Sequence, residues 1–225
     1  IGTQKIFTIN NDLLYQLPTS TSGTLQLRVR TYNGSTQIGS DVYKNVTVYV
    51  SGSVAPTVGT ITLNPVDITT KDGIPRNILV QGKNKLTVSI SGCTAGTGSS
   101  IKSYTFSGPG ISSTTTATSV TSSSAMSNTG SLKYTVTATD SRGRTASKSA
   151  TITCYAYTPP DFTSFSAYRA NSDGTANPNG TYLKCTYGAN YNSVNNTNNI
   201  TVSVYYITGT TSKKVSNNNG SVLVN

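Results

Sequence analysis

Two stretches of alternating apolar and polar residues recur along the chain, and this repeat constrains the fold more than any other feature. The apolar positions of the first stretch are Leu25, Leu27, Val29, Val46, Val48 and Val50, with an Asn33-Gly34 turn between the two runs. The second stretch comprises Leu132 to Ala138 and Ala150 to Cys154, and 104 residues separate Val48 from Ile152. Alternation with a period of two is typical of half-buried strands. The repeat predicts tandem β modules, which usually act as spacers or surface-binding rods.

The composition also favours strands over helices. Thr, Ser and Asn make up 91 of the 225 residues, and the chain has 14 Tyr but no Glu, His or Trp. Thr and Tyr suit pleated strands, Ser and Asn suit turns, and the absence of Glu removes a good helix former. We therefore predict an all-β fold.

Two proline-containing junctions, Ser51 to Pro56 and Tyr157 to Pro160, divide the chain. Short connectors of this kind limit how freely neighbouring modules swing. We predict tandem immunoglobulin-like β-sandwich modules with incomplete end modules. Residues 1–55 form the C-terminal part of a module, 56–157 a complete sandwich, and 158–225 a third module that is truncated or closes differently.

The expected strands follow from the alternation. They cover residues 5–10, 25–30 and 42–50 in the first module, 58–63, 85–91, 101–106, 116–121, 132–139 and 147–155 in the second, and 162–168, 182–187 and 200–206 in the third. Because the first module shows only its last strands, we expect the chain to begin inside a module. No closing strand is evident before Asn225, so we expect an open sheet edge that a partner covers.

The residue types available exclude most catalytic designs. Without His, the chain lacks the commonest general base and metal ligand. All seven acids are Asp, expected in turns or at module edges, where a convergent pair for carboxylate chemistry is not expected. We predict a protein that is not an enzyme, with no catalytic, cofactor-binding or metal-binding residues, and we assign no ligand-binding residue.

Two motifs have simpler explanations than the functions they bring to mind. The segment Asn171 to Asn179 alternates oxygen-bearing side chains like a calcium loop, but Ala176 replaces the required Gly and Tyr182 the closing Glu. We expect Asx turns there. Six Asn-X-Ser/Thr sequons begin at Asn33, Asn45, Asn179, Asn195, Asn199 and Asn219. A chain this rich in Ser and Thr produces that number by chance, so they indicate no glycosylation.

The three cysteines are too few and too scattered for a disulfide framework. Cys154 shares the inward phase of Ala150 and Ile152, and Cys185 that of its apolar neighbours, so we expect both to be small buried residues with free thiols. A bond between Cys93 and Cys154 is the alternative, because both belong to the second module.

The net charge of +10 is concentrated in residues 56–155, which carry nine Lys or Arg against three Asp. Such a surplus attracts polyanions, either a nucleic acid, a teichoic-type phosphate polymer or an acidic polysaccharide. The alternative is that outward or turn residues, such as Lys133, Arg142, Arg144 and Lys148, keep the strands solvated. Candidate phosphate contacts are Lys83, Lys85, Arg142, Arg144, Lys213 and Lys214.

Other partner classes are limited by the sequence. No recognition helix or stacking surface accompanies the basic residues, so we expect no specific nucleic-acid binding. No apolar run approaches the roughly 20 residues of a membrane helix, so we expect no membrane insertion. Tyrosines not obviously in a core are candidates for stacking on sugar rings, or are simply favoured strand residues. They are Tyr15, Tyr32, Tyr49, Tyr191 and Tyr205.

Two segments carry a resemblance to a known group of proteins. YTVTATDSRGRTASKSATITCYAYTPP (Tyr134 to Pro160) and AYRANSDGTANPNGTYLKCTYGA (Ala167 to Ala189) resemble minor structural, tail-associated proteins of tailed phages of the siphovirus type that infect Gram-positive bacteria. The resemblance implies tandem immunoglobulin-like modules in the virion tail or host-adhesion device, other tail proteins as partners, and a homo-oligomer. It supplies no catalytic residues and remains an analogy of fold.

We therefore predict a phage tail structural protein, a rod that spaces or presents host-contacting parts. The first alternative is a module that binds a host cell-wall saccharide or teichoic-type polymer through exposed Tyr and the basic surface. The second is a bacterial adhesin stalk located at the bacterial cell surface.

Overall fold

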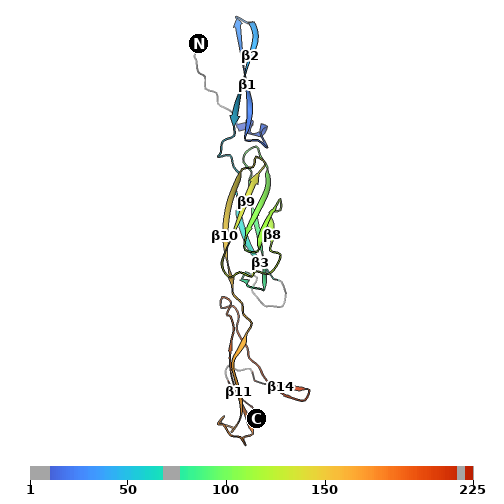
Figure 1. The fold of residues 1–225 in the computed structure, drawn as a ribbon, viewed down its shortest axis with the longest axis vertical. Helices are drawn as coiled ribbons and strands as arrows, with labels where there is room; N and C mark the ends of the chain where they lie inside the picture. The colour runs from blue at the N-terminus through green and yellow to red at the C-terminus, as the bar shows by residue number, and fades with distance from the viewer. Residues whose placement is uncertain (1–10, 68–76, 217–220, 225) are drawn as a thin grey trace.

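The computed structural model describes residues 11–67, 77–216 and 221–224, which form a long rod built of β-sheets (Figure 1). A β-hairpin occupies one end, a two-sheet sandwich the middle, and a third group of strands the other end. The helical element of the described residues is one 3-10 segment, η1 (Asn11–Gln16). The prediction of an all-β fold is confirmed, because strands account for nearly all regular structure.

The N-terminal end is a long antiparallel hairpin of β1 (Ser22–Asn33) and β2 (Thr36–Tyr49). Gly34 has φ +57, which a two-residue hairpin turn requires at its first central position. No other described strand pairs with this hairpin. Its apolar residues, which the alternation predicted to face a core, are largely exposed. The predicted strand 5–10 lies outside the described residues.

The middle of the rod is a sandwich of two sheets. One has the order β4-β10-β9-β6-β7 and the other β3-β5-β8. The strands are β3 (Thr60–Asp67), β4 (Leu79–Val80), β5 (Asn84–Ser91), β6 (Ile101–Gly108), β7 (Ile111–Thr115), β8 (Ser119–Thr121), β9 (Gly130–Asp140) and β10 (Thr145–Tyr155).

Alternating residues from both sheets fill the core of this sandwich. On β5 the buried positions are the predicted ones, Leu86, Val88 and Ile90. The facing sheet contributes Phe106, Leu132, Tyr134, Val136, Ala138 and Cys154. The Tyr134 hydroxyl donates a hydrogen bond of 2.9 Å to the Pro109 carbonyl, and burial raises the pKa of Tyr134 to about 12. Apolar burial on this scale is the main stabilising term of the middle sandwich.

Two details of this sandwich differ from the sequence predictions. The predicted strand 116–121 is β8 alone, and the preceding hydroxyl-rich residues form β7, a hairpin partner of β6. Apolar alternation could not reveal β7 because its outward positions and most of its inward ones are Ser or Thr. The two-residue strand β4 was also missed, since its pairing with β10 is parallel and depends on the tertiary fold.

The C-terminal end holds two small sheets. β11 (Asp161–Ala170), β12 (Tyr182–Asn190) and β15 (Ser221–Val224) form one, in the order β11-β12-β15. β13 (Val204–Thr208) and β14 (Thr211–Ser216) form a separate hairpin that projects to the side of the rod (Figure 1). The predicted strand 200–206 begins only at Val204. The strands β14 and β15 were not predicted because they are short and lack clear alternation.

Candidate functional site

The turn between β9 and β10 holds the N-terminal part of the rod to the middle sandwich. It contains Asp140, Arg142 and Arg144, and its partners are the segments 14–17 and 50–54 on either side of the N-terminal hairpin. The two arginines lie more than eighty residues from these partners in the sequence. We call this group of contacts the arginine junction.

Arg142 is the centre of the arginine junction. Its guanidinium donates to the carbonyls of Leu17 at 2.7 Å, Thr97 at 2.8 Å and Leu14 at 2.7 Å. The planar fork of Arg presents several donors in fixed directions, which a lysine cannot reproduce. Because Arg142 is only 7 % exposed, the interpretation of this residue as a solvated turn cation or phosphate contact is wrong.

Arg144 binds the connector that follows the hairpin. Its guanidinium donates to the carbonyls of Val50 and Val54, both at 2.6 Å, and to that of Ser51. The sequence predicted that this connector restricts motion through its proline. The structure adds a second restraint, because three of its main-chain carbonyls accept hydrogen bonds from one charged side chain.

Asp140 fixes the turn that carries both arginines. Its carboxylate is fully buried and accepts from the main-chain N–H groups of Arg142 at 3.0 Å and Arg144 at 2.9 Å, and from the Ser99 hydroxyl at 3.1 Å. The prediction that the acids lie in turns is correct for Asp140, but its burial was missed. The pattern Asp-x-Arg-x-Arg after an alternating strand was the available signal.

Close packing supports the same junction. Gly98 has φ +77, and a Cβ atom there would collide with the carbonyl carbon and oxygen of Leu14. A larger residue would therefore be strained in its backbone and would displace the segment that Arg142 binds.

The second junction is smaller and mainly apolar. Ile78 and Val80 of the middle sandwich form a buried cluster with Val194 from the C-terminal end, and Tyr155 and Tyr157 pack against it. Lys83 lies 4.8 Å from the centroid of the Tyr157 ring, a cation–π contact. This contact assigns an internal role to Lys83, one of the candidate phosphate-binding residues.

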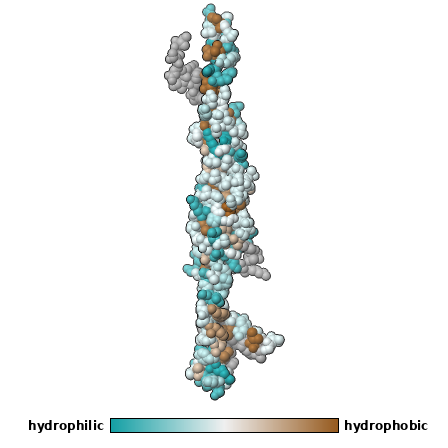
Figure 2. Space-filling view, viewed as in Figure 1, coloured by the Kyte–Doolittle hydropathy of each residue, from teal (hydrophilic) through white to brown (hydrophobic). Residues whose placement is uncertain are grey.

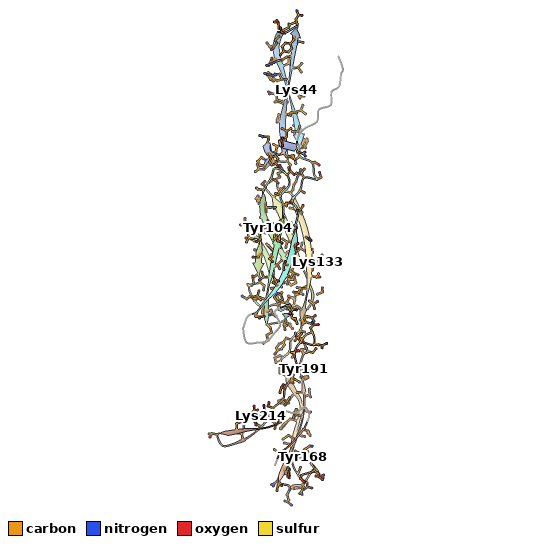
Figure 3. The ribbon with its side chains drawn as sticks, turned by 180° about the vertical axis from the view of Figure 1, so that it is seen from behind. Lys44, Tyr104, Lys133, Tyr168, Tyr191 and Lys214 are labelled. Atoms are coloured by element: carbon orange, nitrogen blue, oxygen red, sulfur yellow. The ribbon has the colours of Figure 1, made fainter. Side chains whose placement is uncertain are left out.

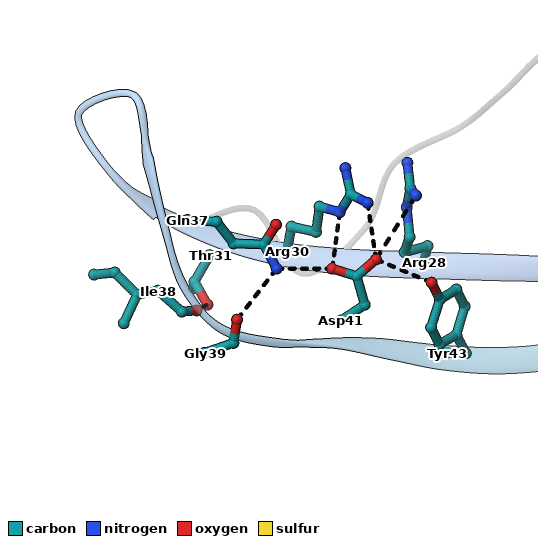
Figure 4. Close-up of polar contacts among 8 residues, drawn as sticks. All are labelled: Arg28, Arg30, Thr31, Gln37, Ile38, Gly39, Asp41 and Tyr43. Carbon is teal, nitrogen blue, oxygen red and sulfur yellow. Dashed lines mark hydrogen bonds and ion pairs between the residues drawn. The ribbon is translucent and has the colours of Figure 1, made fainter.

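The polar face of the N-terminal hairpin carries a charged cluster centred on Asp41 (Figure 4). Arg30 donates to both carboxylate oxygens at 2.9 Å, and Gln37 and Tyr43 donate at 2.8 and 2.9 Å. The Arg30 guanidinium holds the pKa of Asp41 well below its usual range. The cluster ties the two strands together beyond the β-bulge that follows Val29.

We expect the hairpin to lose order in acid. A carboxyl whose pKa is lower in the folded state stabilises the fold above its unfolded pKa, about 3.9, and this contribution is lost as the pH falls further. Amide protection factors of β1 and β2, measured by hydrogen exchange, should fall between about pH 5 and pH 2. The variant Asp41→Asn should show much less change over the same range. Equal loss of protection in both proteins would contradict this role.

The exposed tyrosines do not form one binding platform. Tyr15, Tyr32, Tyr49, Tyr191 and Tyr205 are all exposed, as predicted. Figure 3 shows how widely such side chains are spread, with Lys44 on the hairpin, Lys133 on the sandwich, and Tyr191, Tyr168 and Lys214 at different places along the C-terminal end. The structure therefore brings none of the five together into a stacking surface.

The remaining predicted motifs have structural roles. In the calcium-like loop, Asp173 accepts the main-chain N–H of Thr175 and Asn177 that of Asn179, which confirms the expected Asx turns. Cys154 and Cys185 are buried as predicted, and all three cysteines are free thiols. Among the described residues, no three His, Cys, Asp or Glu side chains gather as a metal site would require, and no helix is long and apolar enough to cross a membrane.

Apolar surface is instead concentrated at the two ends of the rod. Figure 2 shows brown patches over the N-terminal hairpin and the C-terminal strands, while the middle is mainly hydrophilic or neutral. At the C-terminal end a groove lies between the β11–β12 sheet and residues 202–205. Its lining includes Phe162, Phe165, Leu183, Cys185, Tyr187 and Tyr205. Uncovered apolar faces of this kind usually mark interaction sites.

Together these features define an elongated all-β protein whose parts are arranged in series and whose exposed apolar faces lie at its ends. The sequence profile of a family described as "Siphovirus protein of unknown function (DUF859)" matches residues 1–220. The chain belongs to this siphovirus family and is a bacteriophage protein, as the resemblance implied. No curated protein matches the chain.

Proposed function

We propose that the chain is a virion structural protein of the phage tail or host-adhesion device, acting as a rod-like spacer that presents contacting parts. In this proposal its parts are tandem immunoglobulin-like modules with bounds 1–55, 56–157 and 158–225, and it has no catalytic role. Other tail proteins are its partners, and it assembles as a homo-oligomer.

The arginine junction is the observation that carries this proposal. A spacer must transmit position along its length, and flexible linkers cannot do so. Arg142 and Arg144 instead hold six main-chain carbonyls, five of them from the segments that flank the hairpin. The membership of a siphovirus family supports a phage setting for this rod.

The location can be tested by labelling intact virions with an antibody raised against the chain, followed by electron microscopy. We expect label along the tail or at its tip. An antibody against a capsid protein serves as the control for access to the particle. Label confined to the capsid, or none on particles that contain the protein by mass spectrometry, would contradict the tail assignment.

The wall-polymer hypothesis has less support from the structure. Several cations of the basic middle region are engaged internally, because Arg142, Arg144 and Lys148 donate to carbonyls and Lys83 contacts an aromatic ring. The basic surface open to a polyanion is therefore smaller than the net charge indicates. The family match also favours a phage protein over a bacterial adhesin stalk.

A further inference from the structure

The C-terminal strands repeat the order and register of the middle sandwich. β12 lies between β11 and β15 as β5 lies between β3 and β8, and β13–β14 is a tight hairpin like β6–β7. The corresponding pairs are Val88–Val120 and Cys185–Val222, then Ile61–Ile90 and Phe165–Tyr187. Among the described residues, the C-terminal end has no strands that correspond to β9 and β10.

The N-terminal hairpin has the register of those two strands. Its pairs Leu25–Val46, Leu27–Lys44 and Val29–Val42 correspond to Tyr134–Ala150, Val136–Lys148 and Ala138–Ala146. The hydrogen bond of 2.8 Å from the Val50 N–H to the Thr21 carbonyl corresponds to the pairing of Cys154 with Gly130. One end of the rod therefore carries the two strands for which the other end has no described counterpart.

We propose that the β1–β2 hairpin of one copy docks onto the C-terminal strands of a second copy and completes a sandwich there. We call β1–β2 the donor hairpin. The acceptor face comprises Phe165, Ala167, Leu183, Cys185 and Tyr187. The docked sheet would have the order β2-β1-β13-β14, which reproduces the order β10-β9-β6-β7 of the middle sandwich. Addition of strands from another chain to an exposed sheet is a recurring mode of recognition.

The apolar residues at the two ends support this docking. Val136 and Ala138 are fully buried in the middle sandwich, whereas their counterparts Leu27 and Val29 are 44 % and 65 % exposed. On the acceptor face Phe165 is 66 % exposed. Burying both faces against each other would remove apolar surface from water at each end of the rod.

Polar groups at the two ends are also complementary. In the middle sandwich the ammonium of Lys148 donates to the Gly59 carbonyl at 2.6 Å, which links β10 to the segment before β3. The corresponding pair across the proposed contact is Lys44 of the donor hairpin and the main chain at Thr163. The acceptor face also holds the Tyr187 hydroxyl, which is buried without a hydrogen-bond partner among the described residues. A docked strand offers main-chain groups that would satisfy it.

The positions of the two elements require a second copy. The donor hairpin and the acceptor strands lie at opposite ends of the rod, with the whole middle sandwich between them (Figure 1). They cannot meet within one chain. A head-to-tail contact joins unlike surfaces, so each copy that docks presents a new acceptor face and the rods extend in line.

Analytical ultracentrifugation of the full chain tests this proposal. We expect the average mass to rise with concentration through dimers to longer oligomers. The variants Leu27→Asp, on the donor hairpin, and Phe165→Asp, on the acceptor face, should each weaken association by at least about 100-fold, since each would bury an unpaired charge. Both residues are exposed, so the circular dichroism spectrum should not change. Lys133→Asp, on an exposed face of the middle sandwich, is the control and should leave association unchanged.

Mixing the two variants gives the decisive result. Leu27→Asp retains a working acceptor and Phe165→Asp a working donor, so an equimolar mixture should form a 1:1 dimer that grows no further. Dimers of either variant alone would indicate that like faces pair, and would overturn the proposal. A wild-type chain that stays monomeric at all accessible concentrations would also overturn it, and would leave some other chain segment as the occupant. Neither result bears on the tail assignment, which labelling of virions tests separately.

Discussion

The variant Phe106→Ala is expected to lower the free energy of unfolding of the middle sandwich by about 4 kcal/mol. Phe106 is 1 % exposed and lies on β6 within the core between the two sheets. Removing its ring leaves a cavity that the surrounding strands cannot fill, because interiors are closely packed. A loss of this size is a large share of the total stability of an ordinary domain.

Hydrogen exchange of the β5 and β9 amides should measure this loss, because these strands belong to the middle sandwich alone. The matched control is Phe165→Ala, the same change at a side chain that is 66 % exposed. We expect the control to stay within about 0.5 kcal/mol of the wild type in dilute solution. Comparable losses from both variants would show that the C-terminal strands and the sandwich unfold as one unit.

The variant Arg142→Ala is expected to release the N-terminal hairpin from the middle sandwich. It removes donors to three carbonyls, two of them from the segment 14–17, and hydrogen bonds from charged groups contribute about 1.5–3 kcal/mol each. The side chain is also nearly buried, so packing is lost with the charge. We expect the attachment of the hairpin to weaken by about 3 kcal/mol.

Small-angle X-ray scattering should detect the release as a broader distribution of intramolecular distances, while the circular dichroism of the sandwich stays unchanged. Arg142→Lys should restore little, because an ammonium cannot reach the three carbonyls together. Lys133→Ala removes the same charge from an exposed strand position and serves as the control. If Arg142→Ala scattered like the wild type, the arginine junction would not be what aligns the rod.

The ease of prediction differed from one part of the chain to another. Leu86, Val88 and Ile90 were placed in the core correctly because they alternate with Thr and Ser, and a period of two is a local property. The same reasoning placed Leu27 and Val29 in a core and was wrong for this chain, since both are exposed. Alternation shows which residues share a face, but it does not show what covers that face.

By itself, then, the sequence determined the all-β fold, the main strands, the inward positions of Cys154 and Cys185, and the lack of histidine chemistry. These follow from composition and from contacts between residues close in the chain. The tertiary structure alone decided that Arg142, Arg144 and Asp140 form a junction rather than a solvated basic turn. Their partners lie about 40 to 130 residues away, and the hydrogen bonds that redirect them depend on the path of the folded main chain.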